Sequence, residues 1–368
     1  MNFDKSMFRI LILTKRQYTN KDLLDDRFGR LWELPSEIGR KGHAVSVLCL
    51  SYQKKKEEKL STENVSWQSV NAGRTKISGL TRFISRAAGL TRQADVIWAC
   101  SDSFYGIIGH QLSQKYQVPL VFDLYDNFNF FLAAKLPIVK QLYGLALREC
   151  DAVTCVSKPL AHLIKASGRS KPIYVIENAA GNEFSGARDK SECRKRFGLP
   201  QQANIVGTAG ALHKNRGINH LFDAFRYLKS EQQNLHLALA GPANIAIPED
   251  ERIHYLGVLP SNDVPFFYNA LDVAVICNSE NDFGRYCFPQ KTREIMACKV
   301  PLISARVGSM QEMMQHNPEW LYKPDSPEDL ARVLKDRLYN NSADYGPQPS
   351  WSDIADSLIE IFREVSKG

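Results

Sequence analysis

Short apolar runs alternate with amphipathic segments along both halves of this chain. Runs such as 8–14 and 44–50 are rich in branched side chains and bounded by glycine or polar residues, which is typical of buried strands. Segments such as 30–41 repeat apolar residues at helical spacing. In the first half we therefore expect strands at 8–14, 44–50, 95–100, 119–125, 152–157 and 172–178, with helices at 30–41, 104–116, 131–149 and 159–166. Strands that alternate with helices predict a doubly wound parallel α/β sheet.

The second half repeats this alternation after a polar, glycine-containing stretch at 179–192, which we interpret as an interdomain linker. We expect strands at 203–210, 235–241, 252–257, 273–277 and 300–304, and helices at 218–228 and 262–270. A short helix should open near Glu294, and residues 350–366 should form a terminal amphipathic helix. The pattern predicts two domains, 1–180 and 181–350, followed by a crossover helix at 351–368.

Composition supports a globular protein of two ordinary domains. The chain has 368 residues, of which 44% are hydrophobic and 24% charged. It contains no apolar run of about 20 residues, the length that a membrane span needs, and its first residues do not follow a signal-peptide pattern. The eight cysteines are scattered and form no CxxC pair, which favours reduced, buried thiols in a cytoplasmic protein and argues against structural zinc.

The net charge of +7 is unevenly distributed. Residues 1–176 contain 26 Lys and Arg against 15 Asp and Glu, whereas the remainder has 21 against 25. Residues 64–94 carry five basic side chains and no acidic one. Such asymmetry indicates an anionic partner: phospholipid, a lipid pyrophosphate or nucleic acid.

Within this basic stretch, residues 75–92 have the spacing of an amphipathic helix. Its candidate membrane- or acceptor-binding cations are Lys76, Arg82, Arg86 and Arg92. One interpretation is an interfacial helix on anionic lipid. The other is an ordinary helix packed on the sheet with solvated arginines. Nucleic-acid binding is not supported, because no aromatic-rich basic stripe or known module is present.

The stretch 283–305 carries the most informative chemistry. A polar loop with Pro289 and Lys291 leads towards Glu294, and a β-branched strand follows. A carboxylate can accept two hydrogen bonds from a vicinal diol, and a lysine can neutralise phosphate. Diol and phosphate together outline a nucleotide sugar. The alternative is that Glu294 merely favours a helix N-terminus and Lys291 is solvated.

An ordered series of motifs resembles the retaining glycosyltransferases of family 4. They are IGRKGHAVSVL, DAVTCVS, YVIENAAGNEF, VGTAGALHKNRGINHLFDAF, LHLALAGP, IHYLGVLPSNDVPFFYNALDVAVI and CFPQKTREIMACKVPLISA. The resemblance covers nearly the whole chain. It implies a GT-B architecture: two Rossmann-like doubly wound domains that face a central cleft, with the C-terminal helix packing back towards the N-terminal domain. The first domain would bind the acceptor and the second the donor.

The resemblance also assigns roles to individual residues. Glu294 would hold the donor ribose, and Lys291 precedes it in a P-x-K-x-x-E variant of the family motif. Arg216 would grip the donor diphosphate, which Gly29 approaches from the first domain. Gly257 and Leu259 would line the base pocket.

Three positions depart from the family pattern. Tyr286 replaces a glutamate that binds the donor sugar, and its role would pass to backbone amides around Cys287 and Phe288, or to Glu280 or Asp282. Ala211 replaces an arginine, for which Lys214 or His213 could compensate. Tyr125, followed by Asp126, replaces a histidine.

The expected reaction builds charge on the departing diphosphate, and Arg216 and Lys291 would stabilise it. No Asp-x-Asp pair argues for a metal, so neither metal nor cofactor is expected. In a front-face reaction the leaving phosphate can take the acceptor's proton. Asp126, at the carboxyl end of a parallel strand, would position acceptor or donor sugar; equally, it could be a turn or N-cap residue.

The sequence thus predicts a hexosyltransferase-type enzyme of polysaccharide or glycolipid biosynthesis. Its partners would be a nucleotide sugar and a glycan or lipid-linked acceptor, without nucleic acid. Its place would be the cytoplasm, with possible peripheral contact at the inner face of the membrane. Two alternatives stay open: a sugar-nucleotide epimerase of the same architecture, and a non-catalytic nucleotide-sugar-binding subunit.

Overall fold

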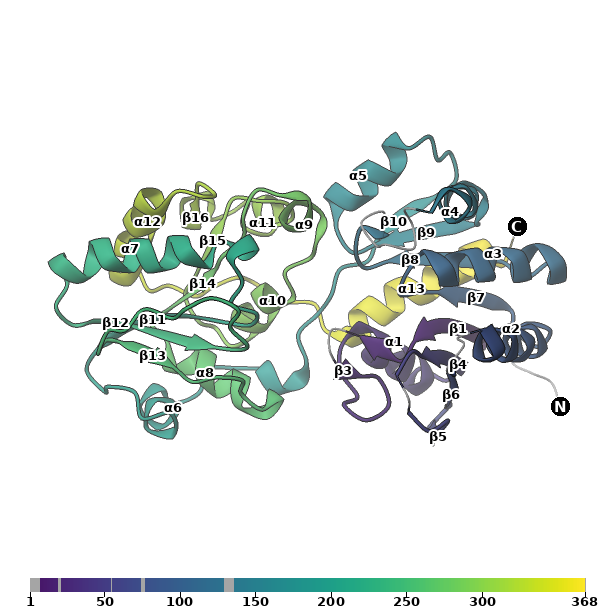
Figure 1. Ribbon diagram of the computed structural model, residues 1–368, viewed down its shortest axis with the longest axis horizontal. Helices are drawn as coiled ribbons and strands as arrows, with labels where there is room; N and C mark the ends of the chain where they lie inside the picture. The colour runs from purple at the N-terminus through teal and green to yellow at the C-terminus, as the bar shows by residue number, and fades with distance from the viewer. Residues whose placement is uncertain (1–6, 19–20, 54, 74–76, 129–135, 368) are drawn as a thin grey trace. The chain divides into compact units, whose positions relative to one another are not determined.

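The computed structural model describes residues 7–18, 21–53, 55–73, 77–128 and 136–367. They form two compact units (Figure 1). Unit 1 comprises the chain up to Asn178 together with the residues from Trp351 onwards, and unit 2 is Ala179–Ser350.

Unit 1 is built on an eight-stranded sheet in the order β10-β9-β8-β7-β1-β4-β6-β5. Its strands are β1 Arg9–Lys15, β4 Ala44–Ser51, β5 Lys59–Thr62, β6 Val65–Asn71, β7 Val96–Ala99, β8 Leu120–Leu124, β9 Ala152–Cys155 and β10 Ile173–Val175. All neighbouring pairs are parallel except β5 with β6. A small antiparallel hairpin, β2 (Gln17–Tyr18) and β3 (Lys21–Asp22), follows β1.

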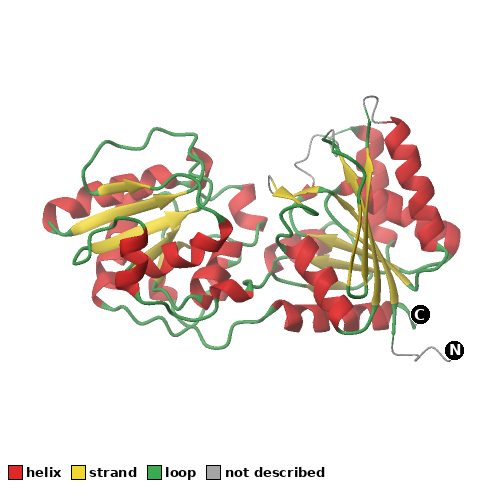
Figure 2. Cartoon of the chain, turned by 90° about the horizontal axis from the view of Figure 1, so that it is seen from below, coloured by secondary structure: helices red, strands yellow, loops and turns green. Residues whose placement is uncertain are grey.

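Helices lie on both faces of this sheet (Figure 2), as a parallel sheet buried on two sides requires. They are α1 Arg30–Arg40, α2 Ile77–Thr91, α3 Ser103–Tyr116, α4 Pro137–Glu149, α5 Lys158–Ala166 and α13 Trp351–Val365. The side chains of Asp102 and Ser157 cap α3 and α5 by accepting hydrogen bonds from first-turn amides.

Unit 2 contains a six-stranded, all-parallel sheet in the order β13-β12-β11-β14-β15-β16. Its strands are β11 Asn204–Ala209, β12 Leu235–Ala240, β13 Ile253–Tyr255, β14 Val273–Ile276, β15 Leu302–Ala305 and β16 Leu321–Tyr322. Its helices are α6 Lys190–Arg196, α7 Ile218–Glu231, α8 Val264–Ala270, α9 Asp282–Tyr286, α10 Gln290–Ala297, α11 Met310–Met313 and α12 Pro327–Tyr339. Single 3₁₀ turns are η3 Asn182–Phe184, η4 Lys214–Arg216, η5 Ser261–Asp263 and η6 Pro318–Trp320.

The predicted pair of Rossmann-like α/β sheets is confirmed, and so is the return of the terminal helix to the first domain. Helix α13 belongs to unit 1, where Phe362 meets Trp98 edge-on at 6.2 Å between ring centroids. Lys41 at the end of α1 forms a 2.8 Å ion pair with Asp356. Six apolar or small residues of α13 are buried: Trp351, Ala355, Leu358, Ile359, Ile361 and Phe362.

Two local predictions were wrong. Helix α10 begins at Gln290, after Pro289, so Lys291 lies in its first turn and Glu294 in the middle of the helix. Pro289 is the N-cap residue of α10, where its missing N–H removes no hydrogen bond within the helix. The stretch 179–192 is not a free linker: it contains η3, whose Phe184 is 5% exposed in the core of unit 2, and the start of α6.

The expected helix 131–149 is found only from Pro137, as α4. Residues 129–135 lie outside the described residues, so the first part of that prediction is not addressed.

Candidate functional site

Three glycines at the carboxyl ends of neighbouring strands form the floor of the site in unit 2. Gly210 follows β11, Gly241 follows β12, and Gly257 follows β13. A Cβ on Gly241 would lie 2.1 Å from the carbonyl oxygen of Gly210, and the amide of Gly241 donates to the Gly257 carbonyl at 2.6 Å. Gly210 and Gly241 have φ of 123° and 122°, which side chains rarely tolerate. The backbone is therefore bare where parallel strands bind ligands.

Lys291 projects from the first turn of α10 onto this floor. A Cβ built on Gly210 would lie 1.2 Å from its Nζ, so the ammonium occupies the space that a side chain there would fill. Burial, followed by the nearby Arg216 guanidinium, lowers the pKa of Lys291 to about 8. Arg216 thus lies close enough to Lys291 for both cations to bind one anion.

Arg216 lies in η4, the turn between β11 and α7. Its guanidinium is 4.8 Å from the centroid of the Phe283 ring, on α9. Gly217, with φ of 71°, is the N-cap residue of the 14-residue helix α7. Because a helix N-terminus carries partial positive charge, Arg216, Lys291 and α7 together form a site for an anion.

Asn281 fixes the turn that carries Arg216. Its side-chain amide donates to the Asn215 carbonyl at 3.0 Å, and its side-chain oxygen accepts from the amide of Gly284 as the N-cap of α9. The loop after β14 is therefore tied to the loop after β11, which limits movement of the Arg216 backbone.

Glu294 is 7% exposed, one turn after Lys291 on α10. The Tyr268 hydroxyl donates to its Oε2 at 3.4 Å. Burial raises the pKa of Glu294 to about 7, against the opposing effect of Lys291. The carboxylate can therefore change charge near neutral pH.

The other predicted donor-binding residues of unit 2 lie on η4, after β13 and around α9. Lys214 is exposed on η4, beside Arg216, while Leu259 packs against the core just after Gly257. Tyr286 ends α9, Phe288 is buried, and the Cys287 amide already donates to the Phe283 carbonyl at 3.0 Å. Glu280 is exposed, with Arg285 at 3.7 Å. The Cys287 amide is thus engaged in ending a helix.

Gly29 and Asp126 lie in unit 1, linked by aromatic side chains. A Cβ on Gly29 would lie 3.1 Å from Cε1 of Tyr18, whose ring meets that of Tyr125 edge-on at 5.0 Å. The Tyr125 hydroxyl donates to the Ser101 carbonyl at 2.8 Å. Asp126 follows β8 and accepts from the amide of Asn127 at 2.7 Å.

Lys15 and Asp102 belong to the same part of unit 1 and were missed from the sequence. Lys15 Nζ lies 5.7 Å from the Tyr125 ring centroid. Burial lowers the pKa of Lys15, while Asp102 and Asp126 act to raise it. Burial likewise raises the pKa of Asp102, against the effect of Lys15. Their position at the ends of β1 and β7 was the signal that could have identified them.

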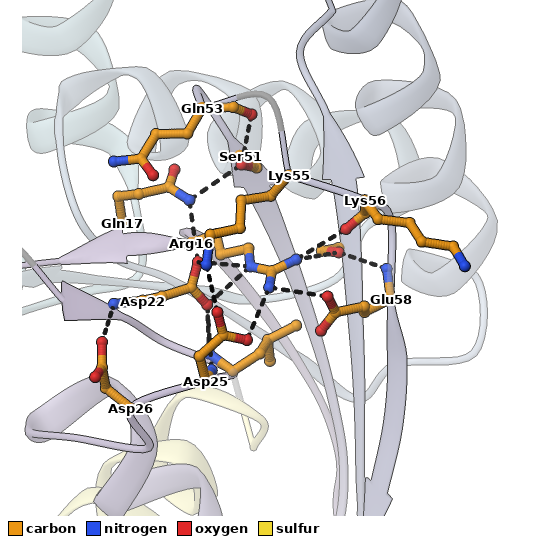
Figure 3. Close-up of polar contacts among 12 residues, drawn as sticks. Arg16, Gln17, Asp22, Asp25, Asp26, Ser51, Gln53, Lys55, Lys56 and Glu58 are labelled. Carbon is orange, nitrogen blue, oxygen red and sulfur yellow. Dashed lines mark hydrogen bonds and ion pairs between the residues drawn. The ribbon is translucent and has the colours of Figure 1, made fainter.

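A buried arginine organises the segment that leads to Gly29 (Figure 3). Arg16 is fully buried, with ion pairs to Asp22 at 2.9 Å and to Asp25 and Glu58 at 3.2 Å each. Burial alone would raise the pKa of Asp22, but hydrogen bonds from Arg16 and backbone amides hold it below its usual value. These contacts join the β2–β3 hairpin to the strands beside it.

A second buried pair fixes the start of α1. Arg30 lies directly after Gly29 and binds Asp123 of β8 through two hydrogen bonds of 3.0 and 2.7 Å. Asp123 also accepts from the Thr154 hydroxyl at 2.6 Å, and Arg30 donates to the Ile176 carbonyl at 2.8 Å. The position of Gly29 therefore depends on contacts across several strands.

The predicted cations on α2 are largely engaged within the protein. Arg82 and Arg86 each pair with Glu57 at 3.0 Å, and the Arg92 guanidinium lies 5.4 Å from the Tyr116 ring centroid. Lys76 lies outside the described residues. The acidic partner of these arginines, Glu57, thus lies outside residues 64–94.

Two family models match the chain. Residues 30–180 match "Glycosyltransferase Family 4", and residues 203–340 match "Glycosyl transferases group 1". Together they cover more than half of the sequence. An uncharacterized glycosyltransferase of Methanocaldococcus jannaschii is 23% identical over 90% of this chain and 92% of its own length. A D-inositol 3-phosphate glycosyltransferase of Streptomyces bingchenggensis is 23% identical, with 72% of this chain and 65% of its own length covered.

Solved structures share the fold. A glycosyltransferase from Rickettsia africae has a TM-score of 0.72 at 15% identity, covering 98% of this chain and 99% of its own. The Anabaena protein HepE in complex with UDP and glucose has a TM-score of 0.67 at 16% identity, covering 98% and 97%. The protein therefore belongs to the family 4 glycosyltransferases and has the GT-B fold.

The described residues contain no helix of the length and apolarity needed to cross a bilayer. Nor do those residues bring three or more His, Cys, Asp or Glu side chains into an arrangement suited to a metal ion. The eight cysteines are free thiols, and six of them are buried.

Proposed function

We propose that the protein is a retaining, metal-independent hexosyltransferase. It moves a sugar from a nucleoside-diphosphate sugar to a glycan or lipid-linked acceptor, in polysaccharide or glycolipid biosynthesis at the cytoplasmic face of a membrane. The observation that carries this proposal is the convergence of Lys291, Arg216 and the α7 N-terminus over the bare backbone of Gly210, with buried Glu294 one helical turn away.

Each part of the donor has a matching group in unit 2. The diphosphate suits Arg216, a planar bidentate donor, and Lys291, a point charge. Lys214, exposed on the same turn, adds a third cation. Glu294 accepts from the two ribose hydroxyls, and the open backbone around Gly257, with Leu259 beside it, leaves room for a base. Solved structures that share this fold were captured with UDP or with ADP.

The transfer step needs no enzyme-bound intermediate. The bond from the anomeric carbon to the diphosphate oxygen breaks while the bond to the acceptor oxygen forms on the same face. The acceptor proton passes to the departing diphosphate oxygen. Arg216 and Lys291 stabilise the charge that develops there, because fixed cations bind the leaving group more tightly as the bond breaks.

Asp126 positions the acceptor or the donor sugar from unit 1. It follows a parallel strand, and its Oδ1 is held by the Asn127 amide at 2.7 Å. Lys15 and Asp102 lie near enough to influence one another electrostatically, so this part of unit 1 can contact a polar, hydroxyl-rich acceptor.

The test is a screen of UDP-, GDP- and ADP-sugars by thermal shift, followed by product analysis with candidate acceptors. Arg216→Ala should lower turnover about a hundredfold, with a smaller loss of affinity for the bare nucleoside. Arg285→Ala is the matched control, since that arginine is half exposed and lies on α9.

The outcomes separate the rival functions. A product with inverted configuration at the anomeric carbon would contradict retention. Nucleotide-sugar binding without transfer or hydrolysis under any condition would favour a binding subunit, and epimerised donor without acceptor would favour an epimerase.

A further inference from the structure

Helix α4 exposes an apolar stripe that no other described element covers. Ile138 is 72% exposed, and Leu142 and Leu145 are 37% and 39% exposed. Their spacing of i, i+4 and i+7 places them along one side of the helix. Leu136, just before the helix, is 59% exposed. Three large aliphatic side chains along one side of a helix, with a fourth just before it, are unusual on a soluble surface.

The stripe is separate from the face by which α4 packs on unit 1. That face consists of Tyr143, Ala146 and Leu147, which are buried. A groove of about 470 Å³ lies beside the stripe, where α4 meets α3. Its walls include Leu142 and Leu145 from α4 and Ile107 from α3. The exposed apolar surface therefore continues from the helix into the groove.

The charge around this surface is positive. Residues 103–122 and 136–148 contain no Asp or Glu, and they contribute Lys115, Lys140 and Arg148, all exposed. The acid that ends α4, Glu149, lies beside Lys171, which donates to its carbonyl and is 3.8 Å from the Asp151 carboxylate. Lys115 lines the groove, and Arg148 follows Leu145 at i+3 and so lies on the flank of the stripe, whereas Lys140 lies on the opposite side of α4. An apolar stripe with cations on its flanks is the pattern of a helix that lies in the interface of an anionic membrane.

We propose that α4, rather than α2, docks unit 1 on an anionic phospholipid bilayer. Ile138, Leu142 and Leu145 enter the acyl boundary, while Lys115 and Arg148 contact the phosphate headgroups. The proposal rests on the membrane-associated part of the proposed function and specifies its surface.

Two observations favour this surface and this occupant. On α2, Arg82 and Arg86 both pair with the single carboxylate of Glu57, and Phe83 and Ala87 are buried. A second copy of the chain is disfavoured on α4, since a two-fold contact would bring the same cations against one another.

Two isoleucines make a matched comparison between the helices. Ile138 is the second residue of α4 and is 72% exposed; Ile77 is the first residue of α2 and is 70% exposed. Aspartate in a first helical turn does not destabilise the helix, because it complements the dipole. Ile138→Asp and Ile77→Asp therefore change charge and apolarity equally, in equally exposed positions.

The experiment measures sedimentation of the full-length protein with vesicles of phosphatidylcholine alone or with 30% phosphatidylglycerol. We expect binding to the anionic vesicles only. Ile138→Asp should lower the partition coefficient at least about tenfold, because an inserted aliphatic side chain contributes that much. Ile77→Asp should leave the partition coefficient unchanged. Lys115→Glu with Arg148→Glu should lower it relative to the wild type, most strongly at low salt.

Equal effects of the two aspartates, or unaltered binding by Ile138→Asp, would overturn the proposal. A wild-type protein that does not bind the vesicles would also overturn the proposal. The same holds if that protein forms a dimer that Ile138→Asp dissociates. The measurement uses no donor or acceptor, so failure of the transferase assignment would leave its result intact.

Discussion

Lys291 and Glu294 lie one turn apart on α10, and burial shifts their pKa values towards each other. The pKa of Glu294 rises to about 7 and that of Lys291 falls to about 8. Their mutual attraction opposes both shifts but does not cancel them. Between these values the carboxylate and the ammonium are both charged, which is the state that the proposed function needs to bind a ribose diol and a diphosphate.

We therefore predict a bell-shaped pH dependence of nucleotide-sugar affinity, measured by calorimetry from pH 5.5 to 9.5. Affinity should fall below about pH 7, as Glu294 takes up a proton, and above about pH 8, as Lys291 loses one. The diphosphate of a nucleotide sugar does not titrate in this range. Glu294→Gln should remove the acidic limb only, and Lys299→Met, on the exposed lysine after α10, should change neither limb. A flat profile in the wild type would contradict this assignment.

The same shift has a consequence for stability. A carboxyl whose pKa is raised by folding stabilises the fold fully below its unfolded pKa, and this contribution is lost as pH rises through about 7. Glu294→Gln should thus stabilise unit 2 above pH 7 while it weakens donor binding. Opposite effects on stability and binding are common where a site stores a buried charge.

Gly210 is the residue on which the position of Lys291 depends. We predict that Gly210→Ala lowers turnover by at least about tenfold, because its Cβ would occupy the place of the Lys291 ammonium. Gly198→Ala is the control, since Gly198 also has a positive φ, 64°, but nothing lies within 4 Å of its Cβ position. The control should show the backbone strain alone, of about 1–2 kcal/mol. Equal losses of activity in both variants would show that strain, and not displacement of Lys291, is responsible.

At the scale of elements, helix α1 is held by a charge pair rather than by a side-chain cap. Its N-cap is Gly29, which offers no side chain, and the first residue, Arg30, reaches the β8 carboxylate of Asp123. Both partners are almost fully buried, at 1% and 0% exposure. Removal of one partner would leave the other charge uncompensated in the core.

We predict that Asp123→Ala destabilises unit 1 by about 3–5 kcal/mol, measured by denaturant unfolding. Glu360→Ala breaks a surface pair with Arg363, 63% and 38% exposed, and should cost at most about 1 kcal/mol. A cost for Asp123→Ala no larger than that of the control would show that Arg30 is solvated rather than paired.

Most elements could be predicted from the sequence, because a buried parallel strand is a short apolar run. Such a run can be identified without knowledge of the strand that it pairs with. The start of α10 could not be placed, since one polar stretch carries Pro289, the first turn and Lys291 with no apolar periodicity. The pairing of Arg82 and Arg86 with Glu57 was also invisible: it joins positions more than 20 residues apart, and charge counting within a window cannot see it.

Part of the candidate site could also be predicted from the sequence alone. Glu294, Lys291 and Arg216 stand in motifs, so their residue types and order could be read directly. Lys15 and Asp102 stand in none, and the fold alone brings them to strand ends. Tyr268 stands in a motif that gives it no role, and the fold brings it into contact with Glu294. Such residues become evident only when the carboxyl edge of each sheet is known.

At the scale of the whole molecule, unit 2 is a contiguous stretch of chain, whereas unit 1 is assembled from two separate stretches. The buried side chains of α13 fill the surface between α1 and the sheet, as the contact of Phe362 with Trp98 shows. Unit 1 therefore lacks part of its core until α13 is present.

We predict that deletion of residues 351–368 unfolds or loosens unit 1 while unit 2 keeps its protection, measured by amide hydrogen exchange. Deletion of 366–368 alone should leave both units protected, since these residues follow the helix and Ser366 and Lys367 are exposed. Loss of protection in both units after the longer deletion would show that they do not fold independently.

This arrangement sets an order of events on the ribosome. All of unit 2 has been synthesised before the first residue of α13 is made, so the half that we propose to bind the donor can mature before the other half receives its last helix. In the meantime the apolar surface reserved for that helix stays open to water and to chaperones. Translation that stops before residue 351 would then yield a chain with one finished half, which under the proposed function would bind nucleotide sugar without using it.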